Sequence, residues 1–569
     1  MNYNENLKKF RNELDAVGAD AVLVSMNNFF GNFNAECSSI AEISGFTGSN
    51  GRAIVSRDRA ILSVDGRYTK QASEQTDSEI WEIKTYPEFD TNALTKEIVQ
   101  PGQTLAVGAF SITYKSYLSL INASENSGFK VKVLNKFLLL KPNKSTKNIY
   151  LVDNDRKNRI SRIQETLANG EIALLTDNAI IGWIFGVRCA PNAEKCVLPN
   201  CVAMVPHNGE PMLFSDLNPE DSHDDFEFFN IEQFENVIKS LPKSEFVLDY
   251  SRTSLYFPEV LQRNGFSIKQ SKTNYGMFEA IKNEAEIKNM KIACEKASLA
   301  FIKTLAFAEN VKNTSEVEIA EFFENELKKY DDFVSLSFNS ISAFDKNTSI
   351  VHYNPMTHGN TQINRDGLFL FDAGAHFKNA TTDMTRTIYR GIPDHGTLSH
   401  GAKKIYTSIL KSLILFSSAS FPDKSKAYSI DAIARLFVWN EGYDYHFGTG
   451  HGVGSFANVH EHPRISFNST EEITGNMVVT VEPGIYRDDF GMRLENMLLT
   501  KPAEAPGFIE FETLNFIPFS RKLIDVEMLT SVERDWLNEY HQKIFDKFAN
   551  YLTEDNVTLN WLKENTRTI

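Results

Sequence analysis

The order of apolar and polar positions predicts alternating helices and strands in the first part of the chain. Apolar residues recur at helical spacing over residues 6–17, and a short apolar run typical of a buried strand follows at 21–24. Two further runs, at 52–55 and 60–64, flank a polar turn and predict a β-hairpin. These elements indicate an α/β unit.

A polar, proline-bearing stretch at 139–147 predicts a linker, and the helix-then-strand order begins again after it. A helix is expected at 156–167 and strands at 172–175 and 202–205. Residue identity between the two units is too weak to establish an internal duplication, so duplication stays open.

From residue 280 the pattern changes to long helical stretches at 284–309, 315–330 and 397–417, together with clusters of strands. This order favours an α+β domain with helices on one face of a largely antiparallel sheet. A tail at 529–561 predicts one or two surface helices. The length of 569 residues fits about three or four domains. We place the regions at 1–142, 148–275, 280–512 and 513–569.

Composition narrows the classes of partner. A net charge of −15 and an isoelectric point near 5.4 argue against nucleic acid or an anionic membrane, because both select clustered Lys and Arg. No secretory signal is visible, and no run approaches the roughly 18 apolar residues that span a bilayer. Five cysteines, an odd count, fit a reducing compartment, so we expect a cytoplasmic protein.

Two pairs of acidic residues have spacings that place each pair on one side of a sheet. Asp372 ends an apolar strand, and Asp383 follows eleven residues later across a turn near 378–379. In an antiparallel hairpin with an even-length loop, residues an odd number apart face the same side. Glu482 and Glu495, thirteen apart across a turn near 488–489, follow the same rule.

Two carboxylate pairs on one side of a sheet repel each other unless a cation lies between them, which favours a pair of divalent metal ions. His451 stands among glycines, where we expect a tight backbone bend and an uncrowded imidazole. Each feature alone has a structural explanation, a turn cap for the acids and a loop contact for the histidine. Together they favour a dinuclear centre of Mn²⁺ or Co²⁺, with Zn²⁺ admitted, that supplies hydroxide from a bridging water for metal-assisted hydrolysis.

The ordered ligand set resembles that of the pita-bread metallopeptidases, which include methionine aminopeptidases, prolidases and aminopeptidase P. More closely, the chain resembles the three-domain, cytosolic type of Xaa-Pro aminopeptidase. The motifs that carry the resemblance lie at 44–49 and 65–68, at 282–287, at 350–353 and 458–461, and at 524–526 with 535–541. The resemblance implies two creatinase-like α/β domains at 1–142 and 148–275, a pita-bread catalytic domain at 280–512 and a short helical C-terminal extension at 513–569.

The implied activity is removal of an N-terminal residue that precedes proline in a peptide, by a homodimer joined through its catalytic and C-terminal regions. The resemblance implies that Asp383 and Glu495 bridge two metal ions, that Glu482 is also the general base, and that His352 and His460 orient the scissile carbonyl and stabilise the developing charge. The remaining metal ligands would be Asp372 and His451, and the substrate site would include Arg67, Arg493 and Phe447 besides the two histidines.

Phe447 departs from the family pattern, which commonly has a histidine four residues before the metal-binding histidine. His446 stands one residue earlier and is the nearest substitute. Ala380 also replaces a glycine that is usual in the turn before Asp383. Two alternatives stay open: a prolidase that cleaves only Xaa-Pro dipeptides, and a metal-free pita-bread module that binds peptides or proteins.

Overall fold

The computed structural model describes residues 2–26, 39–86, 88–135, 149–152, 155–192, 195–217, 225–391 and 400–569. They form two compact units, Met1–Ala190 with Leu198–Tyr275, and Pro191–Val197 with Gly276–Ile569. The predicted linker at 139–147 lies outside the described residues. Among the described helices, none combines the length and the apolar character needed to cross a membrane.

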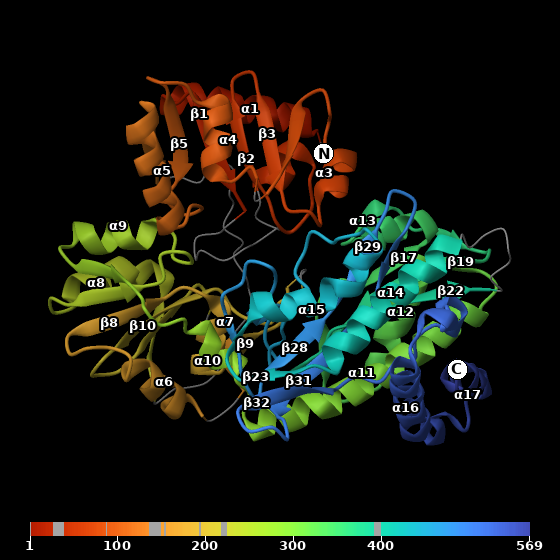
Figure 1. Ribbon diagram of the computed structural model, residues 1–569. Coiled ribbons are helices and arrows are strands. Elements are labelled where there is room, and N and C mark those ends of the chain that lie inside the picture. The colour runs from red at the N-terminus through yellow and green to blue at the C-terminus, as the bar shows by residue number, and fades with distance from the viewer. Residues whose placement is uncertain are drawn as a thin grey trace. The chain divides into compact units, whose positions relative to one another are not determined.

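The first sheet of unit 1 has the strand order β4-β3-β2-β1-β5-β6, and β2 with β3 is the predicted hairpin. Alternate residues of its strands enter two separate cores: Val22 packs with helix α1 on one face, whereas Leu23 packs with α4 and α5 on the other. The elements are α1 Tyr3–Val17, β1 Ala21–Ser25, α2 Ser39–Ser44, β2 Arg52–Ser56, β3 Ala60–Val64, α3 Thr69–Gln75, β4 Trp81–Thr85, α4 Thr91–Ile98, β5 Thr104–Gly108, α5 Tyr114–Ser127 and β6 Lys130–Leu134 (Figure 1).

The second sheet of unit 1 repeats the topology of the first, with the order β12-β11-β10-β8-β13-β14. In both sheets the two central ladders are antiparallel and the flanking ladders are parallel. The elements are β7 Ile149–Leu151, α6 Arg156–Gln164, β8 Glu171–Leu175, α7 Asn178–Phe185, β9 Val187–Cys189, β10 Cys201–Pro206, β11 Met212–Ser215, β12 Glu227–Asn230, α8 Phe234–Ser240, β13 Glu245–Leu248, α9 Tyr256–Arg263 and β14 Ser267–Gln270. The duplication left open by the sequence is therefore present in the strand order.

Unit 2 has the predicted antiparallel character, because every ladder among its described strands is antiparallel. Its long helices share one core with the strands. The helices are α10 Gly276–Ala280, α11 Glu284–Asn310, α12 Glu316–Leu327, α13 Pro355–His358, α14 His400–Ser417, α15 Ala427–Asn440, α16 Ser531–Phe548 and α17 Asn556–Thr566.

The strands of unit 2 form a three-stranded sheet β17-β19-β22, a second one β16-β20-β21, a six-stranded sheet β23-β32-β31-β28-β25-β26 and short pairs. Their bounds are β15 Thr314–Ser315, β16 Phe333–Leu336, β17 Ile341–Phe344, β18 Gln362–Ile363, β19 Gly367–Ala373, β20 Ala375–Phe377, β21 Ala380–Thr381, β22 Met384–Arg390, β23 Ser420–Pro422, β24 Ser425–Lys426, β25 Gly450–Gly452, β26 Glu461–Ile465, β27 Glu472–Ile473, β28 Val478–Val481, β29 Gly484–Tyr486, β30 Gly491–Arg493, β31 Asn496–Pro502 and β32 Phe508–Thr513.

Helix α11 shows how the local sequence sets the start of the first long helix in unit 2. Asn283 caps its first turn, and Glu286 completes a capping box because its carboxylate accepts the backbone N–H of Asn283. Met290, Cys294 and Phe301 then recur on the buried face at helical spacing. The motif at 282–287 is therefore the start of a long helix of unit 2.

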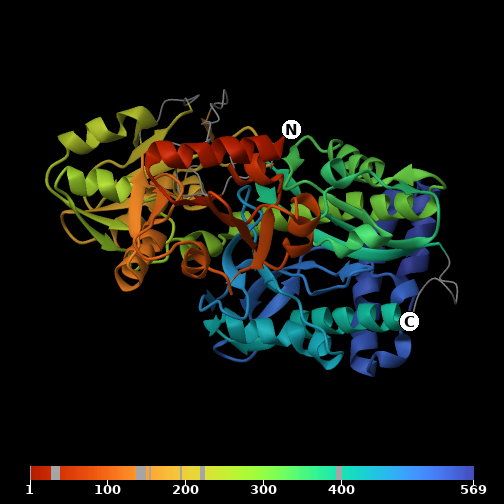
Figure 2. The ribbon, with the colours of Figure 1, turned by 90° about the horizontal axis from the view of Figure 1, so that it is seen from above.

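The C-terminal helices complete the core of unit 2. Helix α16 contacts α14, and α17 contacts α11 (Figure 2). Each helix exposes one face, as predicted for surface helices, but Leu537, Tyr540 and Ile544 are buried in the shared core. This region thus contributes to the interior of unit 2.

His541 on α16 is fully buried, and its Nε2 accepts the backbone N–H of Phe519 at 3.2 Å. Burial, helped by the nearby Arg521 and Arg386, lowers the pKa of His541 to about 3. The imidazole is therefore neutral in the folded protein, whereas in the unfolded chain its pKa is about 6.5.

We expect this difference to make stability fall in acid. Below about pH 6.5 the unfolded chain binds a proton at His541 that the folded chain excludes, so the free energy of unfolding falls by about 1.4 kcal/mol per pH unit toward pH 3. His541→Gln keeps an acceptor for Phe519 but does not titrate. At pH 7.5, urea unfolding followed by tryptophan fluorescence should show a higher free energy of unfolding for the wild type than for the variant. At pH 5 this difference should be smaller by about 2 kcal/mol. The same difference at both pH values would contradict a buried neutral histidine.

Candidate metal centre

Asp372 and Asp383 lie on the same side of the β19–β22 ladder, as predicted. Asp372 is paired with Thr385 and Ala373 with Met384, so Asp383, one residue before β22, is diagonal to Asp372. The connection differs from a simple turn. The chain leaves the ladder at Gly374 and forms the β20–β21 hairpin, which pairs with β16 and has its turn at 378–379.

Gly374 permits this change of sheet. A Cβ there would lie 1.9 Å from the backbone oxygen of Thr382, so only glycine allows the two chain segments to cross this closely. The hydrophobic alternation of the two strands does not reveal the crossing, which is why the sequence predicted one uninterrupted hairpin.

Glu482 and Glu495 face each other directly. Val481 pairs with Asn496 on one side of them, and Gly484 pairs with Arg493 on the other. The register therefore places the two glutamates opposite each other, as the odd spacing predicted.

His451 occupies the middle of strand β25, which pairs with β26 and β28. The prediction of a tight bend at this histidine is wrong. A Cβ at Gly450 would lie 2.0 Å from the oxygen of Thr480, and one at Gly452 would lie 1.8 Å from that of His462. Only glycine at these two positions allows the neighbouring strands to approach so closely.

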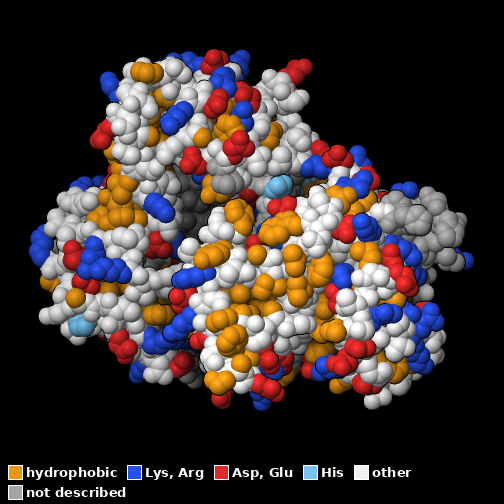
Figure 3. Space-filling view, in the orientation of Figure 1, with side chains coloured by type: hydrophobic (Ala, Val, Ile, Leu, Met, Phe, Trp, Pro, Cys, Tyr) orange, Lys and Arg blue, Asp and Glu red, His pale blue; other side chains and the backbone are white. Residues whose placement is uncertain are grey.

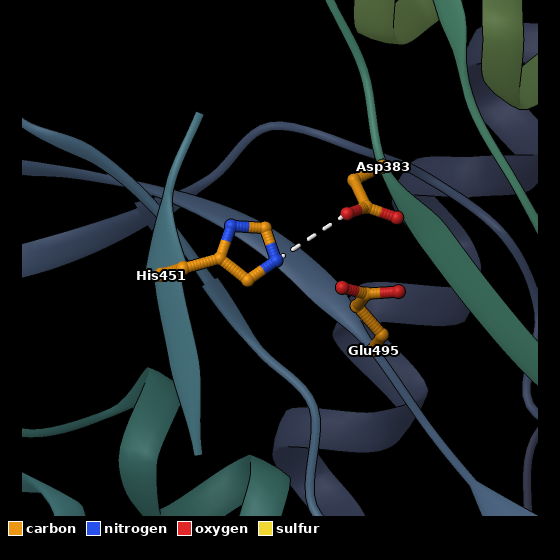
Figure 4. A group of neighbouring side chains, drawn as sticks. All are labelled: Asp383, His451 and Glu495. Atoms are coloured by element: carbon orange, nitrogen blue, oxygen red, sulfur yellow. Dashed lines mark ion pairs between the residues drawn. The ribbon is translucent and has the colours of Figure 1, made fainter. Parts of the chain in front are cut away.

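Three of these side chains converge, from β25, from the start of β22 and from the segment before β31 (Figure 4). One potential ligand atom each from Asp383, His451 and Glu495 lies within 4.8 Å of the others. His451 Nε2 is 3.5 Å from Asp383 Oδ2 and 3.5 Å from Glu482 Oε1. These separations leave room for an ion between the groups.

The tautomer of His451 suits metal binding. Its Nδ1 lies 2.9 Å from the carbonyl oxygen of Gly452 and must donate to it, because a carbonyl can only accept. The lone pair is then on Nε2, which faces the acids. Burial lowers the pKa of His451, although Glu482 partly opposes that shift, and the ring is held neutral.

Two acids of this cluster, Asp383 and Glu495, are destabilised as anions. Burial first, and then the charges of Asp372 and Glu482, raise the pKa of Asp383 well above its usual range. Burial and the charges of Asp383, Asp372 and Glu482 do the same to the pKa of Glu495. Among the described residues, Asp372 Oδ1 is buried without a hydrogen-bond partner. A divalent cation would neutralise this repulsion and satisfy that oxygen, so the residues present fit a metal site.

Arg493 is the cation that the structure itself provides to the cluster. Its guanidinium is buried and donates to Asp372 and to the phenol oxygen of Tyr486, and its Nε is 4.0 Å from Glu482. Burial alone would lower the pKa of Arg493, but the carboxylates around it raise it. One arginine against four acids leaves a negative excess. A substrate contact for Arg493 stays a prediction.

One of the two predicted catalytic histidines lies close to this cluster. The other is adjacent in sequence to a residue that contacts the cluster. The ring of His460 is 4.2 Å from that of His451, and His460 is exposed. His352 is partly exposed, and the carbonyl oxygen of its neighbour Val351 accepts from Arg493 at 3.4 Å.

Phe447 packs against two tyrosines, with ring centroids 4.9 Å from Tyr445 and 5.8 Å from Tyr486. Its carbonyl oxygen accepts from Arg435, a buried arginine paired with Asp431. His446 is exposed. Arg435 therefore holds the loop before His451. Packed aromatic side chains occupy the place at which the family pattern has an imidazole.

Arg67 lies in unit 1, where it forms two hydrogen bonds with Asp65 in the same turn. Its guanidinium also lies over the Tyr68 ring, 5.2 Å from the centroid. Its predicted substrate contact stays a prediction.

Two residues near the cluster were missed from the sequence. Thr385 donates to Glu495 Oε2 at 2.7 Å, and strand alternation could have found it, because it is two residues after Asp383 on the same face. Arg386 could not have been found this way, because an arginine in a strand suggests an exposed position.

Arg386 is fully buried and joins distant segments. It donates to the carbonyl oxygens of Thr385, Glu495 and Ile517 and to the phenol of Tyr540. The backbone at Glu495 is thereby connected directly to the C-terminal helix α16.

Comparison with known proteins identifies these regions. Residues 288–502 match the model of metallopeptidase family M24, 507–569 match the C-terminal region of peptidase M24, and 6–134 match the creatinase/prolidase N-terminal domain. The predicted fold class is confirmed by these matches and by the X-prolyl aminopeptidase of Caenorhabditis elegans, described as cytosolic with a di-nuclear active site. That structure aligns with a TM-score of 0.92 at 23% identity over 100% of both chains.

The relatives agree with these matches. The chain is 30% identical to a probable Xaa-Pro aminopeptidase P of Pyrenophora tritici-repentis over 92% of this chain and 95% of the relative. It is also 30% identical to one of Pyricularia oryzae over 99% of both. The prolidase of Pyrococcus horikoshii aligns over 64% of this chain with a TM-score of 0.51. The chain therefore belongs to metallopeptidase family M24, and within it to the Xaa-Pro aminopeptidase P family.

Proposed function

We propose that this protein hydrolyses the bond between an N-terminal residue and a penultimate proline in peptides. The observation that carries the proposal is the buried convergence of Asp383, His451 and Glu495 beside two further acids. The names of the full-length relatives supply the substrate class.

In this proposal two divalent ions would be held by Asp372, Asp383, His451, Glu482 and Glu495. Mn²⁺ is the first choice, and Co²⁺ and Zn²⁺ are the alternatives. When bound, such ions make a water molecule acidic enough to attack at neutral pH and polarise the scissile carbonyl.

Glu482 is suited to move the proton. Its side chain is 20% exposed, whereas that of Asp383 is 6% exposed, so Glu482 has access to both the cluster and the solvent side. It would accept a proton from the attacking water and pass it to the departing nitrogen of proline. That nitrogen carries no hydrogen in the peptide, so it must gain one to leave as a secondary amine.

His352 and His460 would bind the scissile carbonyl from their partly exposed and exposed positions beside the buried acids. Phe447, Arg67 and Arg493 would complete the substrate site. The domain limits at 142, 148, 275, 280 and 512 and the cytoplasmic location stay predictions.

The metal role of Asp383 can be separated from a role in folding. In Asp383→Asn we expect hydrolysis of an Xaa-Pro peptide with Mn²⁺ to fall at least about 100-fold and the bound metal to decrease. The metal-free variant should melt at or above the metal-free wild type, because one repelling carboxylate is gone. Activity assays, metal analysis and calorimetry measure the three effects.

The exposed Asp546→Asn on α16 is the matched control and should change none of them. Equal activity in Asp383→Asn would contradict the metal mechanism. Wild-type protein that carries no transition metal after purification without chelator, and regains none from Mn²⁺, would favour the metal-free binding module.

Substrate length separates the proposed activity from that of a prolidase. We expect the Mn²⁺-loaded enzyme to release arginine from the tripeptide Arg-Pro-Pro. An aminopeptidase cleaves the first peptide bond and does not require the peptide to end at the proline. Chromatography of the products measures this. Cleavage of Arg-Pro but not of Arg-Pro-Pro would identify a prolidase.

A homodimer is the proposed assembly, and helix α15 offers a surface for it. Tyr428, Leu436 and Trp439 are 45–48% exposed and lie on one side of the helix, while Ile430 and Val438 enter the core. Apolar side chains are visible on the face of the molecule where α15 runs (Figure 3). An exposed stripe of large apolar residues is typical of a protein contact.

Replacing this stripe with charge should prevent assembly. Leu436→Glu combined with Trp439→Glu is expected to convert a dimer to a monomer, as measured by light scattering coupled to gel filtration. The free energy needed to bury the two carboxylates would exceed the free energy that the contact contributes. Leu118→Glu, an exposed leucine on α5 in unit 1, is the control. A dimer that persists in the double variant would place the interface elsewhere.

A further inference from the structure

The segment that carries His352 has little regular structure of its own. It runs from the end of β17 to β18 and includes a 3₁₀ turn at Asp345–Ser349 and the single helical turn α13. Loops of this kind keep a defined shape only where side chains bind their backbone groups. Glu316, the first residue of α12, provides such contacts.

Glu316 is 0% exposed, and four donors surround its carboxylate. Oε1 accepts from the backbone N–H of Phe344 at 2.7 Å and from Asn347 Nδ2 at 2.9 Å. Oε2 accepts from the phenol of Tyr353 at 2.7 Å and from the backbone N–H of Thr361 at 2.9 Å. These donors come from both ends and the middle of the segment, so one side chain fixes its whole course.

The chemistry requires a carboxylate at this position. A glutamine would present an NH₂ group to two donors and leave buried groups unsatisfied. Burial, and then the hydrogen bond with Glu316, raise the pKa of Tyr353, so its phenol keeps the proton that it donates.

The other side of His352 is held from the acidic cluster. Val351 O accepts from Arg493, and the hydroxyl of Thr348 accepts the backbone N–H of Gly491 at 2.9 Å. His352 therefore stands between Val351, fixed to the cluster, and Tyr353, fixed to Glu316.

We propose that Glu316 is a positioning residue for His352: its buried carboxylate sets the backbone on the C-terminal side of His352 and so aims the imidazole at the scissile carbonyl. The inference rests on the proposed role of His352. Glu316 lies outside the group of proposed metal ligands, so its effect should reach the reaction through the histidine alone.

A double-mutant cycle tests this. The variants are Glu316→Gln, His352→Ala and the two combined, assayed with Mn²⁺ and an Xaa-Pro peptide. Glu316→Gln should lower kcat about 10- to 100-fold, since a displacement of about 1 Å costs that much, and KM should change less than about 2-fold. In the His352→Ala background the same change should cost less than about 2-fold, because the group that it positions is absent.

Tyr353→Phe is the second variant, in case Glu316→Gln does not fold. It removes the phenol hydroxyl, which contacts both Glu316 and the carbonyl oxygen of Gly359, and should give a smaller loss of kcat that also vanishes in the His352→Ala background. Glu318→Gln, exposed on the same helix, is the matched control and should leave kcat unchanged. Bound Mn²⁺ should be equal in all of these variants.

The outcomes distinguish the positioning role of Glu316 from the proposed function. An equal loss from Glu316→Gln in both backgrounds, or a loss of bound Mn²⁺, would overturn the positioning role and leave the proposed function intact. Full activity in His352→Ala would overturn the role of His352 in the proposed function, and the role of Glu316 with it.

Discussion

Repulsion among buried carboxylates is the constraint on which the rest of the catalytic unit depends. Asp372, Asp383, Glu482 and Glu495 are brought together with one arginine, and burial raises the pKa of two of them. Side chains that repel one another stay together only if their backbones are held. Two antiparallel ladders do this, one for each pair, and strand β25, which lies between β28 and β26, places His451 beside them.

The same ladders explain how much of the site the sequence revealed. Side chains alternate strictly along strands, so the spacings of Asp372 with Asp383 and of Glu482 with Glu495 predict which of them share a face. The glycines around His451 were misassigned, because the sequence alone does not distinguish a glycine that turns from one that lets strands approach. The sequence left a duplication of the first two sheets open, because residue identity between the two units is weak, whereas the shared strand order makes it visible.

Buried charged residues outside the cluster form a second group that the sequence hides. Glu316 holds the segment of His352, and Arg435 binds the carbonyl oxygens of Tyr445 and Phe447 in the loop before His451. Both start from helices whose pattern suggests that charged positions face solvent. Only the fold shows that irregular loops on either side of the metal site are each anchored by one ionisable side chain.

The contacts of Arg386 join residues that are synthesised at different times. This arginine holds the backbone at Glu495, and its further acceptors, Ile517 and Tyr540, lie 131 and 154 positions after it in the chain. Because a buried guanidinium needs acceptors, Arg386 can take up its buried position in unit 2 only after these late residues have been synthesised. The support of the backbone at Glu495 therefore depends on the last part of unit 2, which includes helix α16.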